Sequence, residues 1–303
     1  MRLSGTDIRL LRVFMAVIRH KGFAAAQAEL NVGQSTISGQ IAALEQRLGV
    51  KLCHRGRAGF HLTPQGESVH QSLERLLLAL DQFATETSAL RGTLAGLLRL
   101  GVVDGVASDP AFRLPDAIAA IMQRAPAVRI QISQGSPQDL QSALFDEKID
   151  ILVGSFPHKI NGLEYKRLYE EENFLYCGRA HGLHAVAEKE LSPEAILLMP
   201  TAGRLYWRED HANNRHFQKT TAYASGIEQQ LILILSGAYV GYLPNHFARP
   251  YCEDGRLRCL LPSQFRYTCP FDAVTRRDAT LPPAASALLD ELLRLTPSET
   301  LAF

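Results

Sequence analysis

The most distinctive chemistry in this 303-residue chain lies on a short helix with an uncharged, hydrogen-bonding face. Apolar residues at 37, 41, 44 and 48 recur at steps of four, three and four, which predicts a helix that buries one face. A solvated opposite face would usually carry Lys and Glu. Short hydroxyls and an amide instead suit close contact with base edges in the major groove of DNA. The residues that we expect to contact DNA on this helix are Gln34, Ser35, Thr36, Ser38 and Gly39.

Elsewhere the chain carries no pattern that predicts catalysis. It has no Gly-x-x-x-x-Gly-Lys-Ser/Thr loop, no Gly-x-Gly-x-x-Gly and no Gly-x-Ser-x-Gly. His181 and His184 have a spacing that metal ligands can adopt, but Gly182 between them favours a solvated loop. The five cysteines lack a Cys-x-x-Cys pair, which favours neutral thiols over a disulfide framework or a redox sensor. We therefore expect no catalytic residue, no cofactor and no metal.

Composition places the chain among ordinary globular proteins. Hydrophobic residues make up 46% and charged residues 21%. No run of eighteen apolar residues predicts a membrane span, and the N-terminus lacks the apolar core of a signal peptide. We therefore expect a cytoplasmic protein. Its length exceeds one compact core and predicts two or three domains.

The elements around the uncharged helix predict a winged helix-turn-helix domain over 1–62. A first helix at 8–18, a small-residue helix at 23–30 and a tight turn at 31–33 precede it. After it, a Gly-containing basic tip at 55–59 resembles a wing, with Arg55 and Arg57 placed for phosphates. Residues 1–66 hold nine Lys and Arg against three Asp and Glu, a balance of +6, while the remainder balances at −5. This asymmetry is typical of a phosphate-binding module joined to a sensor.

Residues 63–91 predict a long linker helix that dimerises. Thr63 suits the N-cap and Pro64 the first helical position. At ~1.5 Å rise per residue such a rod spans roughly 42 Å. A rod of this length needs a second chain to cover its seam, unless it lies on the core of its own subunit. The seam follows the heptad spacing of a coiled coil, at Val69, Leu73, Leu76, Leu80, Phe83, Thr87 and Leu90.

Residues 92–303 predict an α/β domain with two subdomains. Apolar runs at 97–103, 128–132 and 149–154 alternate with helical patterns, which favours a parallel sheet. A second unit over 161–266 has expected strands at 174–177, 197–200, 221–224 and 240–244. The expected strand at 267–275 and helix at 284–295 return to the first unit. Subdomain I is thus about 92–160 and 267–303, and the chain crosses between subdomains twice.

The ends of these strands predict a ligand crevice. Ser136 and Ser225 stand at helix starts, which favour a small anion such as a carboxylate, although both could be simple N-caps. Asp104 is expected to bond nearby backbone; alternatively it anchors an amine, which would indicate a zwitterionic ligand. The residues expected to bind the effector are Asp104, Gly105, Val106, Ser136, Pro137, Ser155, Phe156, Thr201, Gly203, Arg204, Tyr223, Ser225, Gly226 and Pro244.

The run at 34–41, with Leu44-Glu45, Leu48-Gly49 and Leu62-Thr63-Pro64-Gln65-Gly66, resembles the winged helix-turn-helix of LysR-type transcriptional regulators. Weaker markers such as 148–151 and 236–244 resemble the effector-binding domain of that family, which is like a type 2 periplasmic binding protein. The family usually has Arg where this chain has Gly39, and Phe where it has Cys53. The resemblance implies binding to double-stranded promoter DNA, a small-molecule effector, pairing through the linker helix and a homotetramer. The alternative is a cytoplasmic solute-binding or catalytic α/β protein with an incidental helical module.

Overall fold

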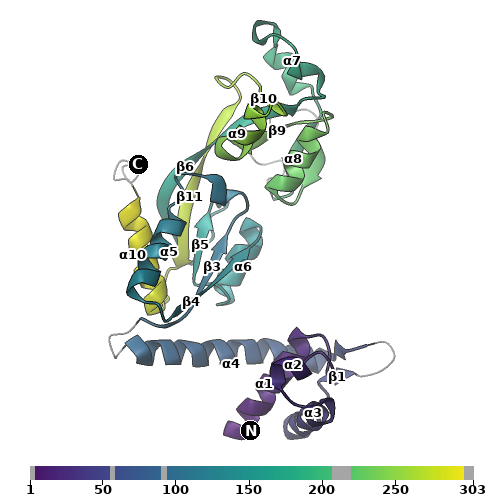
Figure 1. Ribbon diagram of the computed structural model, residues 1–303, viewed down its shortest axis with the longest axis vertical. Coiled ribbons are helices and arrows are strands. Elements are labelled where there is room, and N and C mark those ends of the chain that lie inside the picture. The colour runs from purple at the N-terminus through teal and green to yellow at the C-terminus, as the bar shows by residue number, and fades with distance from the viewer. Residues whose placement is uncertain (1–3, 55–58, 90–93, 207–219, 297–303) are drawn as a thin grey trace. The chain divides into compact units, whose positions relative to one another are not determined.

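The computed structural model describes residues 4–54, 59–89, 94–206 and 220–296, and it divides the chain into two units, Met1–Asp81 and Gln82–Phe303 (Figure 1). The first unit contains α1 (Gly5–Arg19), α2 (Gln27–Leu30), α3 (Gln34–Leu48), β1 (Cys53–His54), β2 (His61–Leu62) and the start of α4 (Pro64–Ala89). The α/β class and the winged helix-turn-helix order are confirmed. In the described part of the chain no helix is both long and apolar enough to cross a bilayer.

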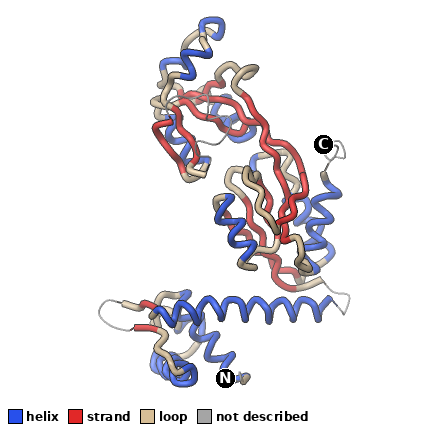
Figure 2. The backbone as a smooth tube through the Cα atoms, turned by 180° about the vertical axis from the view of Figure 1, so that it is seen from behind, coloured by secondary structure: helices blue, strands red, loops and turns tan. Residues whose placement is uncertain are grey.

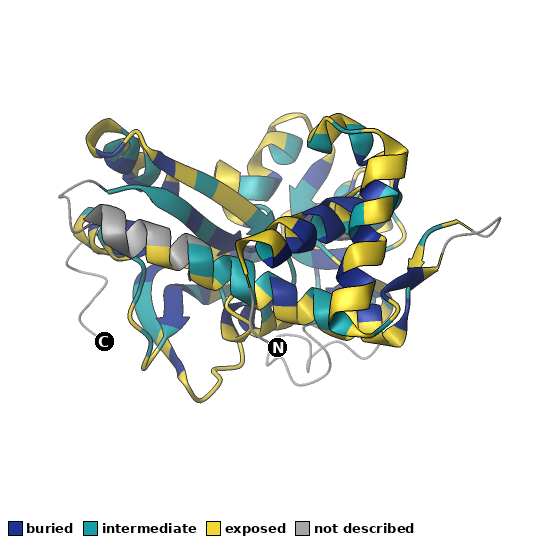
Figure 3. Cartoon of the chain, turned by 90° about the horizontal axis from the view of Figure 1, so that it is seen from below, coloured by how far each residue is buried: buried dark blue, intermediate teal, exposed yellow. Residues whose placement is uncertain are grey.

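The core of the first unit forms where the apolar faces of α1 and α3 meet. Phe14, Ile37, Ile41 and Leu44 are fully buried there, while the other sides of these helices are exposed (Figure 3). At the edge of this core, Asp7 joins the two helices. Its carboxylate accepts hydrogen bonds from the Arg47 guanidinium at 2.8 and 2.6 Å and from Ser4 at the start of α1.

The second helix is shorter than the sequence predicts. Residues 21–26 form consecutive turns and only Gln27–Leu30 is helical. The backbone of Lys21 is left-handed, with φ of 52°, so the chain reverses sharply after α1 and leaves room for one helical turn. Phe23, expected inside the helix, instead packs edge-on against Phe60, with ring centroids 5.9 Å apart.

The start of α4 is fastened to the wing. Thr63 Oγ1 accepts the Gly66 N–H at 2.9 Å, which makes Thr63 the N-cap as expected, and donates to the Lys51 carbonyl at 2.6 Å. A Cβ atom on Gly66 would overlap the carbonyl oxygen of Leu52, so only glycine permits this approach. The helix and the base of the wing therefore form one packed junction.

The predicted seam of α4 changes in burial along its length. Leu73 is 2% exposed, and Val69 and Leu76 also pack on the core of their own unit. Phe83, further along, is 65% exposed. The first half of the seam therefore fits the alternative of a helix lying on its own subunit, whereas Phe83 in the later half is largely exposed. The side chain of Thr87 and all of Leu90 lie outside the described residues.

The second unit is built on one mixed sheet. Its described strands are β3 (Gly96–Val102), β4 (Val128–Gln134), β5 (Ile151–Gly154), β6 (Leu163–Gly178), β7 (Thr201–Arg204), β8 (Thr220–Ala224), β9 (Val240–Pro244), β10 (Leu257–Cys259) and β11 (Arg266–Arg276). They follow the order β4-β3-β5-β11-β6-β9-β7-β8, with β10 also on β6. β3 pairs in parallel with β4 and β5, as the alternating pattern predicts.

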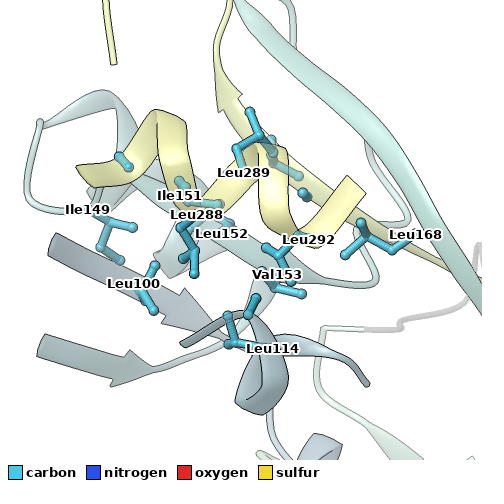
Figure 4. Packing of buried hydrophobic residues seen from close by; sticks show 14 of the residues in the cluster. Leu100, Leu114, Ile149, Ile151, Leu152, Val153, Leu168, Leu288, Leu289 and Leu292 are labelled. Atoms are coloured by element: carbon cyan, nitrogen blue, oxygen red, sulfur yellow. The ribbon is translucent and has the colours of Figure 1, made fainter. Parts of the chain in front are cut away.

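Helices cover both faces of the first half of this sheet. α5 (Leu114–Arg124) and α10 (Pro283–Leu295) pack together on one face, and α6 (Pro137–Phe145) covers the other (Figures 1 and 2). Between the α10 face and the sheet, Leu288, Leu289 and Leu292 pack with Ile151 and Val153 (Figure 4). The 3-10 turn η1 (Val106–Ser108) follows β3 in this first half. The second half carries α7 (Pro193–Leu197), α8 (Ile227–Leu235) and α9 (Asn245–Glu253), with 3-10 turns η2 (Gly182–His184) and η3 (Glu188–Glu190).

Two long strands carry the chain between the subdomains. β6 and β11 pair antiparallel from Leu163↔Arg276 to Phe174↔Arg266. Leu168 on β6 belongs to the first core, whereas Leu175 on the same strand belongs to another. The subdomain boundary therefore runs through the middle of β6 and not at residue 161.

One local prediction in the second subdomain is wrong, and one helix was not predicted. The segment 197–200 is not a strand, because Ser192 caps α7, which continues to Leu197, and the strand begins only at Thr201. The helix α9 was not predicted from the sequence. It contains Pro250, and proline usually ends a helix. Pro250 lies in the last turn of α9, where the disruption is small.

Candidate functional site

The surface of α3 presents the polar residues expected to meet DNA. Gln34, Ser35, Thr36 and Gly39 are exposed and Ser38 is partly buried. The Gln27 side chain accepts the Gln34 N–H at 3.1 Å and so holds the start of this helix. A Cβ atom on Gly39 would meet nothing within 4 Å, so this face has an open gap at its centre. The arrangement offers an amide and hydroxyls with no neighbouring bulk.

Glu45, on the buried side of α3, fastens the helix to the wing. Its carboxylate accepts from Lys51 at 2.7 Å and from the Leu52 N–H at 2.9 Å. Burial would raise the pKa of Glu45, but these donors outweigh it and lower the pKa. Arg55 and Arg57 at the expected wing tip lie outside the described residues.

A cleft of about 470 Å³ lies between the two halves of the second unit. The starts of α6 and α8 and the end of β3 reach it. Predicted residues on its wall are Asp104, Gly105, Ser136, Ser225 and Gly226; Gln134, Gly135, Asp139, Tyr206, Ile227, Glu228, Gln229 and Phe247 complete it. The cleft is thus where strand-end reasoning expected it, but with additional acidic groups.

The carboxylate of Asp104 occupies the N-terminus of α8, one of the two helix starts that were expected to bind an anion. Its Oδ2 accepts the backbone N–H of Ile227, in the first turn of α8. A Cβ on Gly226 would lie 2.8 Å from that oxygen, so glycine permits the approach. Asp104 was expected to bond backbone nearby in the chain. It does bond a backbone N–H, but that group belongs to the other subdomain. With a carboxylate already on this helix end, an anionic ligand would meet repulsion there.

The second helix start is also engaged. Ser136 Oγ accepts the Asp139 N–H at 3.2 Å and donates to the Asp139 carboxylate at 2.6 Å. Ser136 is therefore an N-cap, which was the alternative to its binding an anion. Asp139 and Glu228 stand in the first turns of α6 and α8, where the helix dipole stabilises their negative charge. The cleft wall holds three carboxylates, and none of its described lining residues is Lys or Arg.

One buried cation lies beside this acidic wall. A smaller pocket adjoins the cleft through Asp104 and Tyr206 and also contains Arg204 and Glu171. Arg204 donates to Gln230 at 3.1 Å and to the Tyr206 hydroxyl at 2.7 Å. Burial alone would lower the pKa of Arg204, but the acidic groups around it raise it. The guanidinium therefore stays charged beneath a negatively charged cleft.

The predicted effector residues divide between these pockets and the protein interior. Pro137, Ser155, Arg204 and Pro244 line the smaller pocket. Phe156 is in the core with its ring 6.3 Å from that of Tyr165, and Thr201 is buried and donates to the Met199 carbonyl. Residues that line neither pocket are Val106, Phe156, Thr201, Gly203 and Tyr223. Sequence reasoning missed Asp139 and Glu228, although their place in the first turn of an expected helix was a usable signal.

The histidine and cysteine predictions have mixed outcomes. His181 is buried and its Nδ1 accepts the Leu183 N–H at 3.1 Å, so the expected solvated loop is wrong for this residue. All five cysteines are free. Burial raises the pKa of Cys177 to about 11 and that of Cys269 to about 12, which keeps these thiols neutral.

Comparisons with known proteins agree with the geometry. Residues 8–67 match the model of the bacterial regulatory helix-turn-helix protein, lysR family, and residues 91–297 match the LysR substrate binding domain. The HTH-type transcriptional activator BauR of Pseudomonas aeruginosa is 36% identical over 91% of both chains. The HTH-type transcriptional regulator ClcR of Pseudomonas putida is 28% identical over 96% of this chain and 98% of its own.

Solved structures share the fold. Full-length CbnR complexed with its target DNA superposes with a TM-score of 0.68 at 18% identity and covers 95% of this chain and 99% of its own. A full-length OxyR variant from Pseudomonas aeruginosa gives a TM-score of 0.61 at 20% identity, covering 98% and 99%. Together with the two family models, which span nearly the whole sequence, these likenesses identify the chain as a LysR-type transcriptional regulator with a helix-turn-helix domain and an effector-binding domain.

Proposed function

We propose that this regulator binds promoter DNA through the exposed face of α3, with Arg55 and Arg57 on phosphates, and pairs with a second copy through α4. The observation that carries the proposal is the uncharged polar face of α3, held outward by a fully buried opposite face. CbnR, which shares the fold, has been solved with its target DNA. The protein acts in the cytoplasm as a regulator without catalysis, and the family resemblance extends the assembly to a tetramer.

The DNA contact is tested with the DNA that flanks the gene for this chain. Gln34→Ala should weaken binding by ~1–3 kcal/mol because an amide can pair with a base edge. On random DNA the same change should have little effect. Arg57→Ala should weaken both DNAs alike and reduce the salt slope by about one. Fluorescence anisotropy at several salt concentrations separates these outcomes.

Gln46→Ala provides the control for Gln34→Ala. Gln46 is exposed on the same helix but near its C-terminal end, away from the end that helix-turn-helix proteins point at bases. If Gln34→Ala lowers affinity equally for the flanking DNA and random DNA, the base-reading role is refuted.

The effector that the cleft supports is a small molecule with a protonated amine. Asp104, Asp139 and Glu228 surround the cavity, and a buried ammonium needs such carboxylates to offset the loss of water. The Asp104 carboxylate gives one lone pair to Ile227 and can accept further hydrogen bonds. Arg204 in the adjoining pocket can meet a carboxylate of the same ligand, which gives a zwitterion. We therefore propose an amine or a zwitterion in place of the small anion that the helix starts alone predicted.

Calorimetric titration of the full chain with simple amines, amino acids and carboxylates tests the effector class. Amines or amino acids should bind, and carboxylates without an amine should not. Asp104→Asn keeps an oxygen for the Ile227 N–H but removes the charge, so binding should fall ~10-fold or more, in line with a charged hydrogen bond of ~1.5–3 kcal/mol. Asp146→Asn, on the exposed surface, is the matched control. Binding of simple carboxylates alone would reverse the assignment.

A further inference from the structure

A second polar cluster lies next to the cleft. It contains Asp109, directly after η1, Glu171 on β6 and His246 in the first turn of α9. His246 Nε2 is 3.0 Å from Glu171 Oε1 and 3.6 Å from Asp109 Oδ2. The three side chains are only 8 to 10% exposed. Two carboxylates thus converge on one imidazole nitrogen in a buried position.

The other nitrogen of His246 is fixed by its surroundings. Nδ1 lies 2.9 Å from Ser108 Oγ, and that hydroxyl donates to the Gly105 carbonyl at 3.3 Å. The hydrogen bond between Ser108 Oγ and Nδ1 orients the imidazole ring. Nε2 therefore faces the two carboxylates, in a position where it can join them as a ligand of a metal ion.

We propose that Asp109, Glu171 and His246 bind a divalent transition-metal ion, with Zn²⁺ as the representative. Metal bonds of ~2.0–2.2 Å in tetrahedral geometry place ligand atoms roughly 3.3–3.6 Å apart. The observed separations of 3.0 and 3.6 Å lie close to that range, and all three ligand atoms fall within 4.8 Å of one another. An imidazole nitrogen beside carboxylate oxygens favours transition metals over Mg²⁺ or Ca²⁺.

A supporting shell of hydrogen bonds surrounds the three ligands. Ser108 orients the imidazole, and Asn173 Nδ2 donates to the second oxygen of Glu171 at 3.1 Å. Asp109 Oδ1 accepts the Ala111 N–H at 2.8 Å, which leaves Oδ2 for the cluster. Such outer contacts orient metal ligands and typically change metal affinity ~10–100-fold when removed.

The site would tie the walls of the cleft together. Asp109 belongs to the first subdomain, His246 to the second, and Glu171 to the strand that crosses between them. Gly105 and Phe247, near neighbours of these residues in the chain, line the cleft itself. A bound ion therefore restrains the distance across the cleft, and it does so whichever effector the cleft accepts.

Titration of the full chain with Zn²⁺ alone tests the site. After removal of metals with a chelator, we expect one ion per chain by calorimetry, with proton release that grows as the pH falls because Zn²⁺ displaces the imidazole proton. Co²⁺ should give the intense visible absorption of a low-coordinate nitrogen and oxygen site. His246→Gln and Glu171→Gln should abolish stoichiometric binding. Ser108→Ala, which keeps all three ligands, should weaken it ~10–100-fold.

His158→Gln is the control, since His158 is an exposed histidine of the same unit, and it should bind Zn²⁺ as the unchanged chain does. Circular dichroism checks that each variant is folded. No stoichiometric ion in the unchanged chain would overturn the proposal and leave a hydrogen-bonded cluster. Full binding by folded His246→Gln, or by Ser108→Ala with unchanged affinity, would place the ion elsewhere and overturn it as well.

Discussion

At the scale of single residues, the gap at Gly39 is the feature that most separates this DNA-binding surface from its family pattern. Arginine is usual at this position in the resembling family, and here a Cβ would meet nothing within 4 Å. A glycine inside a helix also costs about 0.8–1 kcal/mol relative to alanine. The chain therefore gives up helix stability and a cation at the centre of the proposed DNA contact, and we expect Ser35 and Ser38 to provide more of the selectivity.

Gly39→Arg should strengthen DNA binding and reduce its selectivity. The arginine has space, adds a phosphate or base contact, and raises helix propensity by roughly 0.5–1 kcal/mol. The affinity for random DNA should rise with a salt slope steeper by about one. Gly39→Ala is the control, since it should raise the unfolding midpoint without changing that slope.

Asp7 makes the stability of the first unit depend on acid. Arg47 and Ser4 lower the pKa of its carboxyl to about 2, whereas an unfolded Asp titrates near ~3.9. The stabilisation is therefore complete above about pH 4 and is lost as the pH falls through about 2. In denaturant unfolding, Asp7→Asn should be less stable than the unchanged chain at pH 7, and this difference should shrink below about pH 4. Asp116→Asn, exposed on α5, should show no comparable pH-dependent difference.

At the scale of elements, periodicity predicted most helices and strands well but could not divide the seam of α4. Leu73 and Phe83 fit the same heptad pattern, yet one is 2% and the other 65% exposed. Spacing reports which residues share a face and not what covers that face. The strand misplaced at 197–200 has a related cause, because a short apolar run reads alike at the end of a helix and in a buried strand.

Substitutions at these two positions should therefore have different effects. Phe83→Asp places a charge at the proposed helix pairing surface, so sedimentation should show a weaker dimer while the unfolding midpoint changes little. Leu73→Ala removes a buried side chain and should destabilise the first unit by ~2–5 kcal/mol. If Phe83→Asp leaves the dimer intact, chains pair through another surface.

At the scale of the whole molecule, the sequence located the cleft but not its charge. Polar residues after strands and at helix starts predicted where a ligand would lie, since strand ends gather at one edge. The relative orientation of the subdomains, which β6 and β11 determine, decides which groups face one another across the cleft. The bond from Asp104 to Ile227 and the convergence of Asp109 with His246 join distant parts of the chain. No local pattern encodes such pairs.

The junction of α4 with the wing, where Gly66 lies against Leu52 and Thr63 bonds Lys51, has a consequence for the operator. Because this junction is closely packed, α4 and the DNA-binding domain should move as one rigid body. Two paired α4 helices would then hold the two α3 helices at one separation and one angular phase along the duplex. An insertion of about 5 bp between half-sites turns one of them to the opposite side of the DNA, while about 10 bp restores its phase. Binding should therefore fall steeply for the shorter insertion, and Gly66→Ala, which forces the joint open, should flatten that dependence on spacing.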